Sequence, residues 1–177
     1  MRTITALFVG LGSIGTRHLK NLANLCADRG WTLQADALRS DLTRPLRPGA
    51  AELLHSQFTT LQDSAALPHY DLAFITNPTS LHVEALQQVK GRGKALFIEK
   101  PIFSAEQTGL NLADCLPENQ KAYVAAPMRW CGVMLALKDL LPTLHPYCAR
   151  VICSSYLPDW RPGVDYRTVY SLSLIHI

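Results

Sequence analysis

Three glycines near the start of the chain have the spacing that a bound dinucleotide requires. The segment 10–15 (GLGSIG) directly follows the apolar run 3–9 and opens a helix-like stretch that continues to Leu25. In such a turn the first glycine allows a tight bend, the second lets the backbone approach a pyrophosphate, and the third lets helix and strand pack closely. The amino terminus of the helix then offers unpaired N–H donors to the anion. The expected cofactor contacts in this segment are Gly10, Gly12, Ser13, Ile14 and Gly15.

A second group of polar residues follows the apolar run 70–76. Thr76 and Asn77 stand where this strand would end, and His82 lies one turn into the helix expected next. Asn77 either contacts the cofactor ribose or is a turn residue before Pro78. His82 either points toward the nicotinamide end or occupies an ordinary helix face. The residues alone leave these alternatives open.

A third group, Glu99 and Lys100, follows the apolar run 94–98. A lysine at the carboxyl end of a strand can donate a hydrogen bond to a substrate oxygen and, where burial lowers its pKa, carry a proton. The alternative for Lys100 is a solvated surface lysine. Glu99 either contacts the cofactor or makes a structural hydrogen bond.

The residues after the expected second strand bear on the choice of cofactor. An acidic side chain there would hold the ribose 2′-OH of NAD, whereas a basic one would accommodate the 2′-phosphate of NADP. Arg39 and Ser40 occupy this position and favour NADP through charge-assisted hydrogen bonds. Asp41 keeps NAD possible, because strand ends read from sequence are uncertain by about two to four residues.

Alternating apolar segments must position these groups. The pattern predicts strands at 3–9, 32–38, 58–61, 70–76 and 94–98, with helices at 14–27, 49–57, 80–90 and from 104 onward. Such alternation predicts an α/β fold of Rossmann type, a doubly wound parallel sheet with ligands at the carboxyl ends of its strands. We expect this domain to span residues 1–124. A helix at 133–141 and a strand at 149–156 indicate the start of an α+β substrate domain over 125–170.

Composition excludes several classes of function. The 177 residues are 48% hydrophobic and 18% charged, with a net charge of +3, which indicates a globular protein. Lysine and arginine form no long run, so neither nucleic acid nor a membrane surface is an expected partner. The five cysteines lack metal-type spacing, so we expect reduced thiols, no metal site and a cytoplasmic location.

The combination of motifs, in this order, resembles the Gfo/Idh/MocA family of oxidoreductases. The resemblance covers residues 4 to about 170 and rests on GLGSIGTRH (10–18), TNPTSLH (76–82), EKP (99–101) and YLPDWRPGVDYR (156–167). It implies nicotinamide-dependent hydride transfer to or from a hydroxyl-bearing carbon of a sugar, cyclitol or related small molecule. Lys100 would then be the catalytic residue, and a homo-oligomer is expected. Thr76, Asn77 and His82 would contact the cofactor. Trp160 and Arg161 would lie near the cofactor, or in a surface loop stiffened by prolines.

The end of the chain departs from the family pattern. No Asp-x-x-x-His pair follows Asp165, and we expect 171–177 to be a non-native tail, so His176 is not assigned to the site. The chain is therefore expected to be the amino-terminal part of a longer oxidoreductase. The alternative is a nucleotide-binding or redox-sensing module without catalysis.

Overall fold

A parallel sheet organises the amino-terminal part of the chain. The computed structural model describes residues 1–60, 69–107, 109–150 and 152. It contains two units, of which the first is Met1–Ala125 and the second begins at Ala126. The six strands of the first unit are β1 (Thr3–Val9), β2 (Thr32–Leu38), β3 (Leu54–Phe58), β4 (Tyr70–Ile75), β5 (Gly93–Ile98) and β6 (Lys121–Val124). All neighbours are parallel and their order is β3-β2-β1-β4-β5-β6, which confirms the expected Rossmann sheet.

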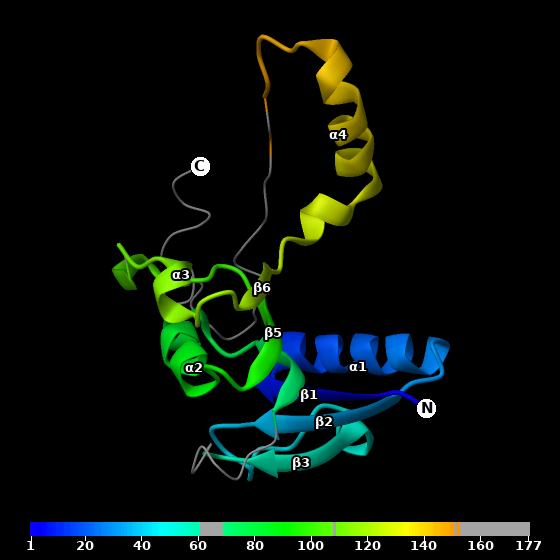
Figure 1. Cartoon of the computed structure of the whole chain (residues 1–177), viewed down its shortest axis with the longest axis vertical. Helices are drawn as coiled ribbons and strands as arrows, with labels where there is room; N and C mark the ends of the chain where they lie inside the picture. The colour runs from blue at the N-terminus through cyan, green and yellow to red at the C-terminus, as the bar shows by residue number, and fades with distance from the viewer. Residues whose placement is uncertain (61–68, 108, 151, 153–177) are drawn as a thin grey trace. The chain divides into compact units, whose positions relative to one another are not determined.

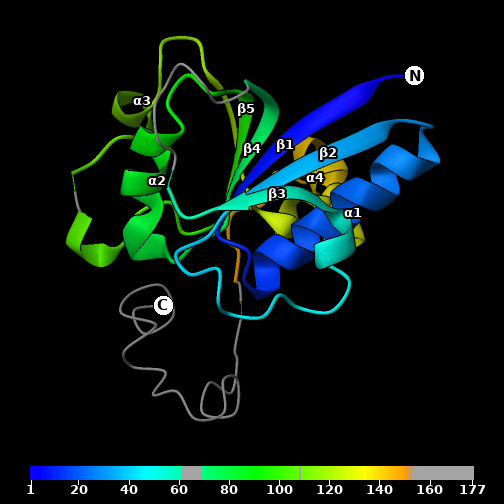
Figure 2. The ribbon, with the colours of Figure 1, turned by 90° about the horizontal axis from the view of Figure 1, so that it is seen from below.

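Helices cover both faces of this sheet (Figures 1 and 2). They are α1 (Ser13–Asp28), α2 (His82–Gln88) and the short α3 (Leu112–Cys115), with 3₁₀ turns at Ala51–Leu53, Thr79–Leu81 and Ala105–Gln107. Successive side chains of a strand point to opposite faces, so β1 contributes to two core clusters. Phe8 packs in the cluster that contains Leu19 of α1, whereas Leu7 packs in the cluster that contains Leu86 of α2.

The sequence of α1 accounts for both its orientation and its end. Gly15, Leu19, Leu22 and Cys26 recur at helical spacing and form its buried face. Gly30 then takes a left-handed φ of 65°, which a residue with a side chain rarely adopts. The N–H of Trp31 donates to the carbonyl of Cys26 at 2.8 Å and closes the helix end.

The connection between β2 and β3 differs from the prediction. The predicted helix at 49–57 is wrong, because only the single 3₁₀ turn Ala51–Leu53 forms there. The strand predicted at 58–61 instead spans Leu54–Phe58 and pairs with β2, with a register shift between Ala35 and Asp36. Its side chains alternate between half-buried and exposed, the pattern of a strand with one covered face.

The remaining helices are shorter than predicted or begin later. The predicted helix 80–90 consists of the turn Thr79–Leu81 followed by α2, and the helix predicted from residue 104 is a 3₁₀ turn followed later by α3. The sheet also contains a sixth strand, β6, which we did not predict from the sequence pattern.

The second unit, as far as it is described, contains the 3₁₀ turn Pro127–Trp130 and helix α4 (Gly132–Leu144). The predicted strand at 149–156 falls mostly outside the described residues, as do Trp160, Arg161 and the tail 171–177. None of the helices in the described part of the chain combines the length and apolar character needed to span a lipid bilayer.

Candidate functional site

Backbone hydrogen bonds hold the carboxyl ends of four neighbouring strands level with one another. Each bond joins the first residue beyond one strand to the last residue of the next strand in the sheet. The bonds run from Gly10 to Leu38, from Thr76 to Val9 and from Glu99 to Ile75, each with a nitrogen to oxygen distance of 2.9 Å. Neighbouring strands lie about 4.8 Å apart, so the three predicted groups form one row along this edge. The order of connection reverses between β1 and β4, which is where open α/β sheets bind ligands.

Two of the three motif glycines are required by close packing. Gly10 has a φ of 83°, and a Cβ there would lie 2.7 Å from the Cα of Asn77. A Cβ on Gly15 would lie 2.5 Å from the carbonyl oxygen of Gly10. Both positions therefore exclude a side chain for reasons internal to the fold.

Gly12 is different, because a Cβ there would meet no protein atom within 4 Å. It is the N-cap residue of α1, and no side chain caps this helix end or places an acidic group in its first turn. The first N–H groups of α1, at Ser13 and Ile14, are donors of the kind that bind a phosphate. An open glycine beside an uncapped helix end fits the pyrophosphate of a dinucleotide.

Thr76 and Asn77 close the other side of the glycine turn. The hydroxyl of Thr76 donates to the backbone carbonyls of Val9 and Gly10. Asn77 donates from Nδ2 to the carbonyl of Leu81 at 3.1 Å, while its Oδ1 is buried and has no partner among the described residues. A buried acceptor without a donor is costly, so Asn77 is suited to receive a hydroxyl hydrogen bond from a ligand.

His82 is 1% exposed and lies between two segments of the site. Its Nε2 is 3.0 Å from the carbonyl oxygen of Asn77, and its Nδ1 is 3.1 Å from that of Ile102. Each ring nitrogen therefore lies within hydrogen-bond distance of a backbone carbonyl, and a ring N–H can donate to either one. His82 thus joins the Asn77 turn to the chain beyond β5, and a direct cofactor contact stays a prediction.

Glu99 is held by an imidazole from the first helix. Its Oε1 is 2.7 Å from Nε2 of His18, and its Oε2 accepts the backbone N–H of Lys100 at 3.2 Å. Burial acts to raise the pKa of Glu99, but these hydrogen bonds and the nearby positive charges outweigh it, so the pKa lies below its ordinary value. The arrangement supports the structural alternative for Glu99, because its carboxylate already has protein donors.

Lys100 follows Glu99 at the same edge and its side chain is exposed. Its ammonium makes no hydrogen bond or ion pair with any residue that the structure describes. The peptide bond between Lys100 and Pro101 is cis. A free cation thus stands one strand away from the Thr76–Asn77 turn.

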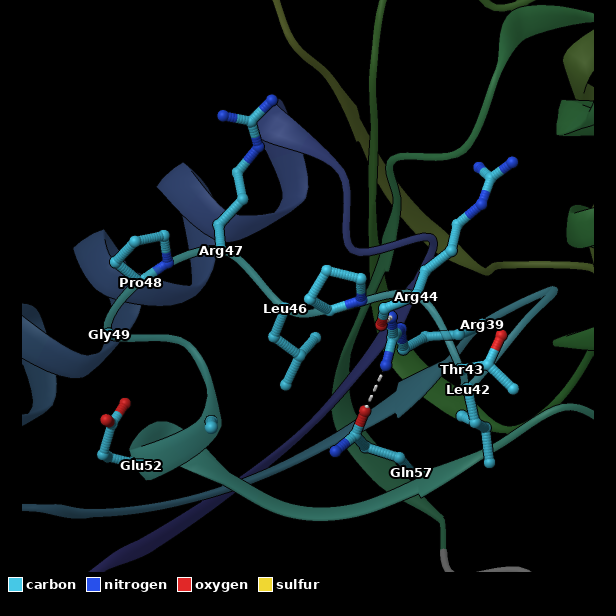
Figure 3. Close-up of a pocket in the computed structure, with 12 residues that line it drawn as sticks. Arg39, Leu42, Thr43, Arg44, Leu46, Arg47, Pro48, Gly49, Glu52 and Gln57 are labelled. Carbon is cyan, nitrogen blue, oxygen red and sulfur yellow. Dashed lines mark hydrogen bonds between the residues drawn. The ribbon is translucent and has the colours of Figure 1, made fainter.

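Arg39 lies at the other end of the row and lines a pocket of about 500 Å³ together with the loop that follows it (Figure 3). Its Nη1 donates to Oε1 of Gln57 at 2.8 Å and its Nη2 donates to the backbone carbonyl of Arg44. Ser40 is exposed beside it. Among the described residues, no group of three or more His, Cys, Asp or Glu side chains is arranged to hold a metal ion.

Sequence reasoning gave several of these neighbours too little weight. His18 was not predicted as a site residue, yet its ring centroid lies 4.8 Å from that of Phe97 and its Nε2 lies 2.7 Å from Oε1 of Glu99. Arg44, Arg47 and Gln57 were not predicted as site residues. The basic segment 44–47 was a usable signal for the two arginines, whereas Gln57 carried none.

The chain resembles several solved dehydrogenases in fold. A WlbA dehydrogenase from Bordetella pertussis, in complex with NADH and UDP-GlcNAcA, is 20% identical with a TM-score of 0.63 over 80% of this chain and 42% of that one. A scyllo-inositol dehydrogenase from Lactobacillus casei with bound NAD(H) and scyllo-inositol is 24% identical with a TM-score of 0.59 over 80% and 41%. A myo-inositol 2-dehydrogenase from Lactobacillus plantarum is 23% identical with a TM-score of 0.60 over 80% and 41%.

This chain therefore spans about two fifths of the length of these structures. No curated protein sequence matches it. A family model described as an oxidoreductase family with an NAD-binding Rossmann fold matches residues 4–126, which run from the second residue of β1 to beyond the end of β6. The chain belongs to the Gfo/Idh/MocA family of oxidoreductases.

Proposed function

We propose that this chain supplies the cofactor-binding part of an NAD(P)-dependent oxidoreductase that moves a hydride between nicotinamide and a hydroxyl or carbonyl carbon of a sugar, cyclitol or related molecule. The observation that carries the proposal is the row of Gly10, Thr76 and Glu99 across the switch point of the sheet, beside an uncapped helix. A family whose fold is NAD-binding supports it.

Each part of the row has a separate role in this proposal. Gly12 and the first N–H groups of α1 would hold the pyrophosphate, and Oδ1 of Asn77 would accept from a ribose hydroxyl. When bound, the nicotinamide supplies the hydride donor or acceptor. His82 and Glu99 would keep the Asn77 turn and Lys100 in fixed positions through their protein contacts.

Lys100 would touch the substrate. Its free ammonium at the carboxyl end of β5 would donate a hydrogen bond to the oxygen on the reacting carbon and so orient that carbon. Substrates with several hydroxyl groups suit such a donor. The fold relatives that hold scyllo-inositol or UDP-GlcNAcA support a sugar or cyclitol substrate.

NADP is the cofactor that the second strand favours. No acid stands at the end of β2, where Arg39 and Ser40 follow Leu38. The acid within this strand, Asp36, is 6% exposed and accepts the hydroxyl of Tyr70 at 2.8 Å, so it is engaged in the core. A basic group at the strand end is the arrangement that accommodates a 2′-phosphate.

Titration of the purified chain with NADPH and NADH, followed by nicotinamide fluorescence, tests the cofactor proposal. We expect saturable binding with NADPH the tighter ligand. Absence of binding to either nucleotide by a folded chain would refute the dinucleotide site.

The catalytic step is tested in a protein of the length of the structural relatives that contains this sequence as its amino-terminal part. Lys100→Ala should lower kcat/KM for an accepted polyol or sugar by about 100-fold or more while leaving NADPH affinity within about 2-fold. Lys90→Ala is the matched control, because Lys90 is exposed and lies beyond α2, away from the row. Nucleotide binding without turnover on a broad panel of sugars and polyols would favour the non-catalytic module instead.

A further inference from the structure

The guanidinium of Arg39 is already occupied by protein acceptors. Nη1 donates to Oε1 of Gln57 at 2.8 Å, and Nη2 donates to the backbone carbonyl of Arg44. Gln57 stands on β3 beside Ala37 of β2, and the backbone N–H of Arg39 donates to the carbonyl of Phe58 at 2.9 Å. Arg39 is therefore fixed to the edge strand and in turn fixes the loop at Arg44.

The loop itself is ordered by local hydrogen bonds. Oδ1 of Asp41 accepts the backbone N–H of Thr43 at 2.8 Å and its hydroxyl at 2.6 Å. Farther along, Leu46 packs against the core cluster on the α1 side of the sheet. These contacts set the direction of the backbone on both sides of Arg44.

Arg44 and Arg47 have their guanidinium groups largely free. The Arg44 side chain is 80% exposed and forms an ion pair with Asp41, with 3.8 Å between Nε and Oδ2, while its guanidinium makes no hydrogen bond with the residues that the structure describes. Arg47 is exposed and its side chain makes no hydrogen bond or ion pair with residues that the structure describes. Figure 3 shows both side chains extending to the same side of the loop, away from Leu46, while Arg39 turns toward Gln57.

We propose that Arg44 and Arg47 bind the phosphate on the adenosine ribose of the cofactor, an inference that rests on the proposed dinucleotide site. Arg39 and Gln57 are then positioning residues for the loop that carries these two arginines. Two exposed guanidinium groups that make no hydrogen bond with the described residues can offer a phosphate several charge-assisted hydrogen bonds. All four residues line the same pocket at the end of β2, where the adenosine ribose of a dinucleotide lies. The ligand class is thus a 2′-phosphorylated adenosine nucleotide.

The test compares 2′,5′-ADP with 5′-ADP, which differ in this phosphate alone, by calorimetric titration of the full chain. Arg44→Ala and Arg47→Ala should each weaken 2′,5′-ADP binding by about 10- to 100-fold and change 5′-ADP binding by less than about 2-fold. Lys90→Ala removes one positive charge far from the pocket and should change neither. Circular dichroism checks that every variant is folded.

Gln57→Ala separates positioning by Arg39 from direct binding. If Arg39 holds the loop, the variant weakens the binding of 2′,5′-ADP and leaves the affinity for 5′-ADP within about 2-fold. If Arg39 is itself the phosphate ligand, freeing it in Gln57→Ala leaves 2′,5′-ADP binding unchanged or tighter, and the positioning role is overturned.

The remaining outcomes separate this inference from the proposed function. Equal affinity of the unmodified chain for 2′,5′-ADP and 5′-ADP would overturn the phosphate site and leave the dinucleotide site standing. Unchanged 2′,5′-ADP binding in both arginine variants would overturn the assignment of the phosphate to Arg44 and Arg47, and the dinucleotide site would still stand. A folded chain that binds neither nucleotide would overturn both proposals.

Discussion

The glycines of the first turn are alike in sequence but not in what surrounds them. A Cβ on Gly15 would overlap the carbonyl oxygen of Gly10, whereas one on Gly12 would project into space free of protein atoms. The first position serves the fold, and the second is open for a ligand. The motif therefore combines a structural constraint and a binding constraint in two glycines that lie three positions apart.

Alanine substitutions should separate these two constraints. Gly15→Ala is expected to lower the free energy of unfolding by about 1–3 kcal/mol, because the added methyl group overpacks rigid backbone. Gly12→Ala should leave the unfolding midpoint nearly unchanged and weaken NADPH binding at least about 10-fold, because the methyl group occupies the space left for the pyrophosphate. Urea unfolding and fluorescence titration measure the two effects. Equal loss of stability in both variants would contradict the distinction.

The contact between Glu99 and His18 should make stability depend on acidity. The pKa of Glu99 in the folded chain lies below its ordinary value of 4.5, so the carboxylate stabilises the fold fully above that pH. This contribution is lost as the pH falls through the lower, folded value. Glu99→Gln should therefore show a shallower loss of stability below pH 4.5 than the unmodified chain in urea unfolding series.

Glu118→Gln is the matched control for this measurement, because Glu118 is exposed and outside the strands. It should follow the unmodified chain at every pH. Parallel curves for the unmodified chain and Glu99→Gln would contradict a pKa of Glu99 that is lower in the folded than in the unfolded chain.

At the scale of elements, the buried strands were the most predictable part of the chain. The predicted limits of the strands at 3–9 and 32–38 agree with β1 and β2 to the residue. Strands buried on both faces are continuous apolar runs bounded by turn residues, so sequence alone marks their ends. The positions of the candidate site segments followed directly, because each segment comes after one of these strands.

The edge strand was less predictable because its signal competes with a helical one. The segment around Ala51–Leu53 has good helix formers, yet the chain continues into β3, where pairing with β2 overrides that propensity. The half-buried alternation of Leu54, Ser56 and Phe58 was the available signal for a strand. Predicting the contact of Arg39 with Gln57 would have required this register.

Register also explains why the role of His18 was missed. Phe8, Phe74, Phe97 and Tyr123 stand opposite one another on β1, β4, β5 and β6 and form an aromatic row. The centroids of neighbouring rings lie 4.5 to 5.4 Å apart, and the ring of His18 lies against this row. Such a row depends on the register between neighbouring strands, and this register cannot be predicted from the sequence of one strand.

At the scale of the whole molecule, both core clusters belong to the first unit. Their fully buried members lie between Ile4 and Ile98, and the partly buried residues packed on them extend no farther than Leu116. Helix α4 of the second unit buries none of its own residues within the described part of the chain. The stability of the sheet therefore has its source within residues 1–125.

A chain ended after Ala126 should fold on its own. We expect a cooperative thermal transition within about 5 °C of that of the full sequence, because no member of either core cluster is removed. Differential scanning calorimetry measures it, with NADPH titration as a second readout. Loss of the cooperative transition would show that the sheet needs residues beyond the first unit.

The loop between β2 and β3 also bears on how such a protein diverges. None of residues 40–49 is buried, although Leu46 is partly covered by the core. In the proposed function, mutations there would alter charge at the adenosine end of the cofactor site with little penalty to packing, so selection could act on this stretch almost independently of foldability. If the proposed function holds, a lineage could thereby exchange one cellular pool of reducing equivalents for another through a few surface changes, while the edge of the sheet that carries Asn77 and Lys100 stays as it is.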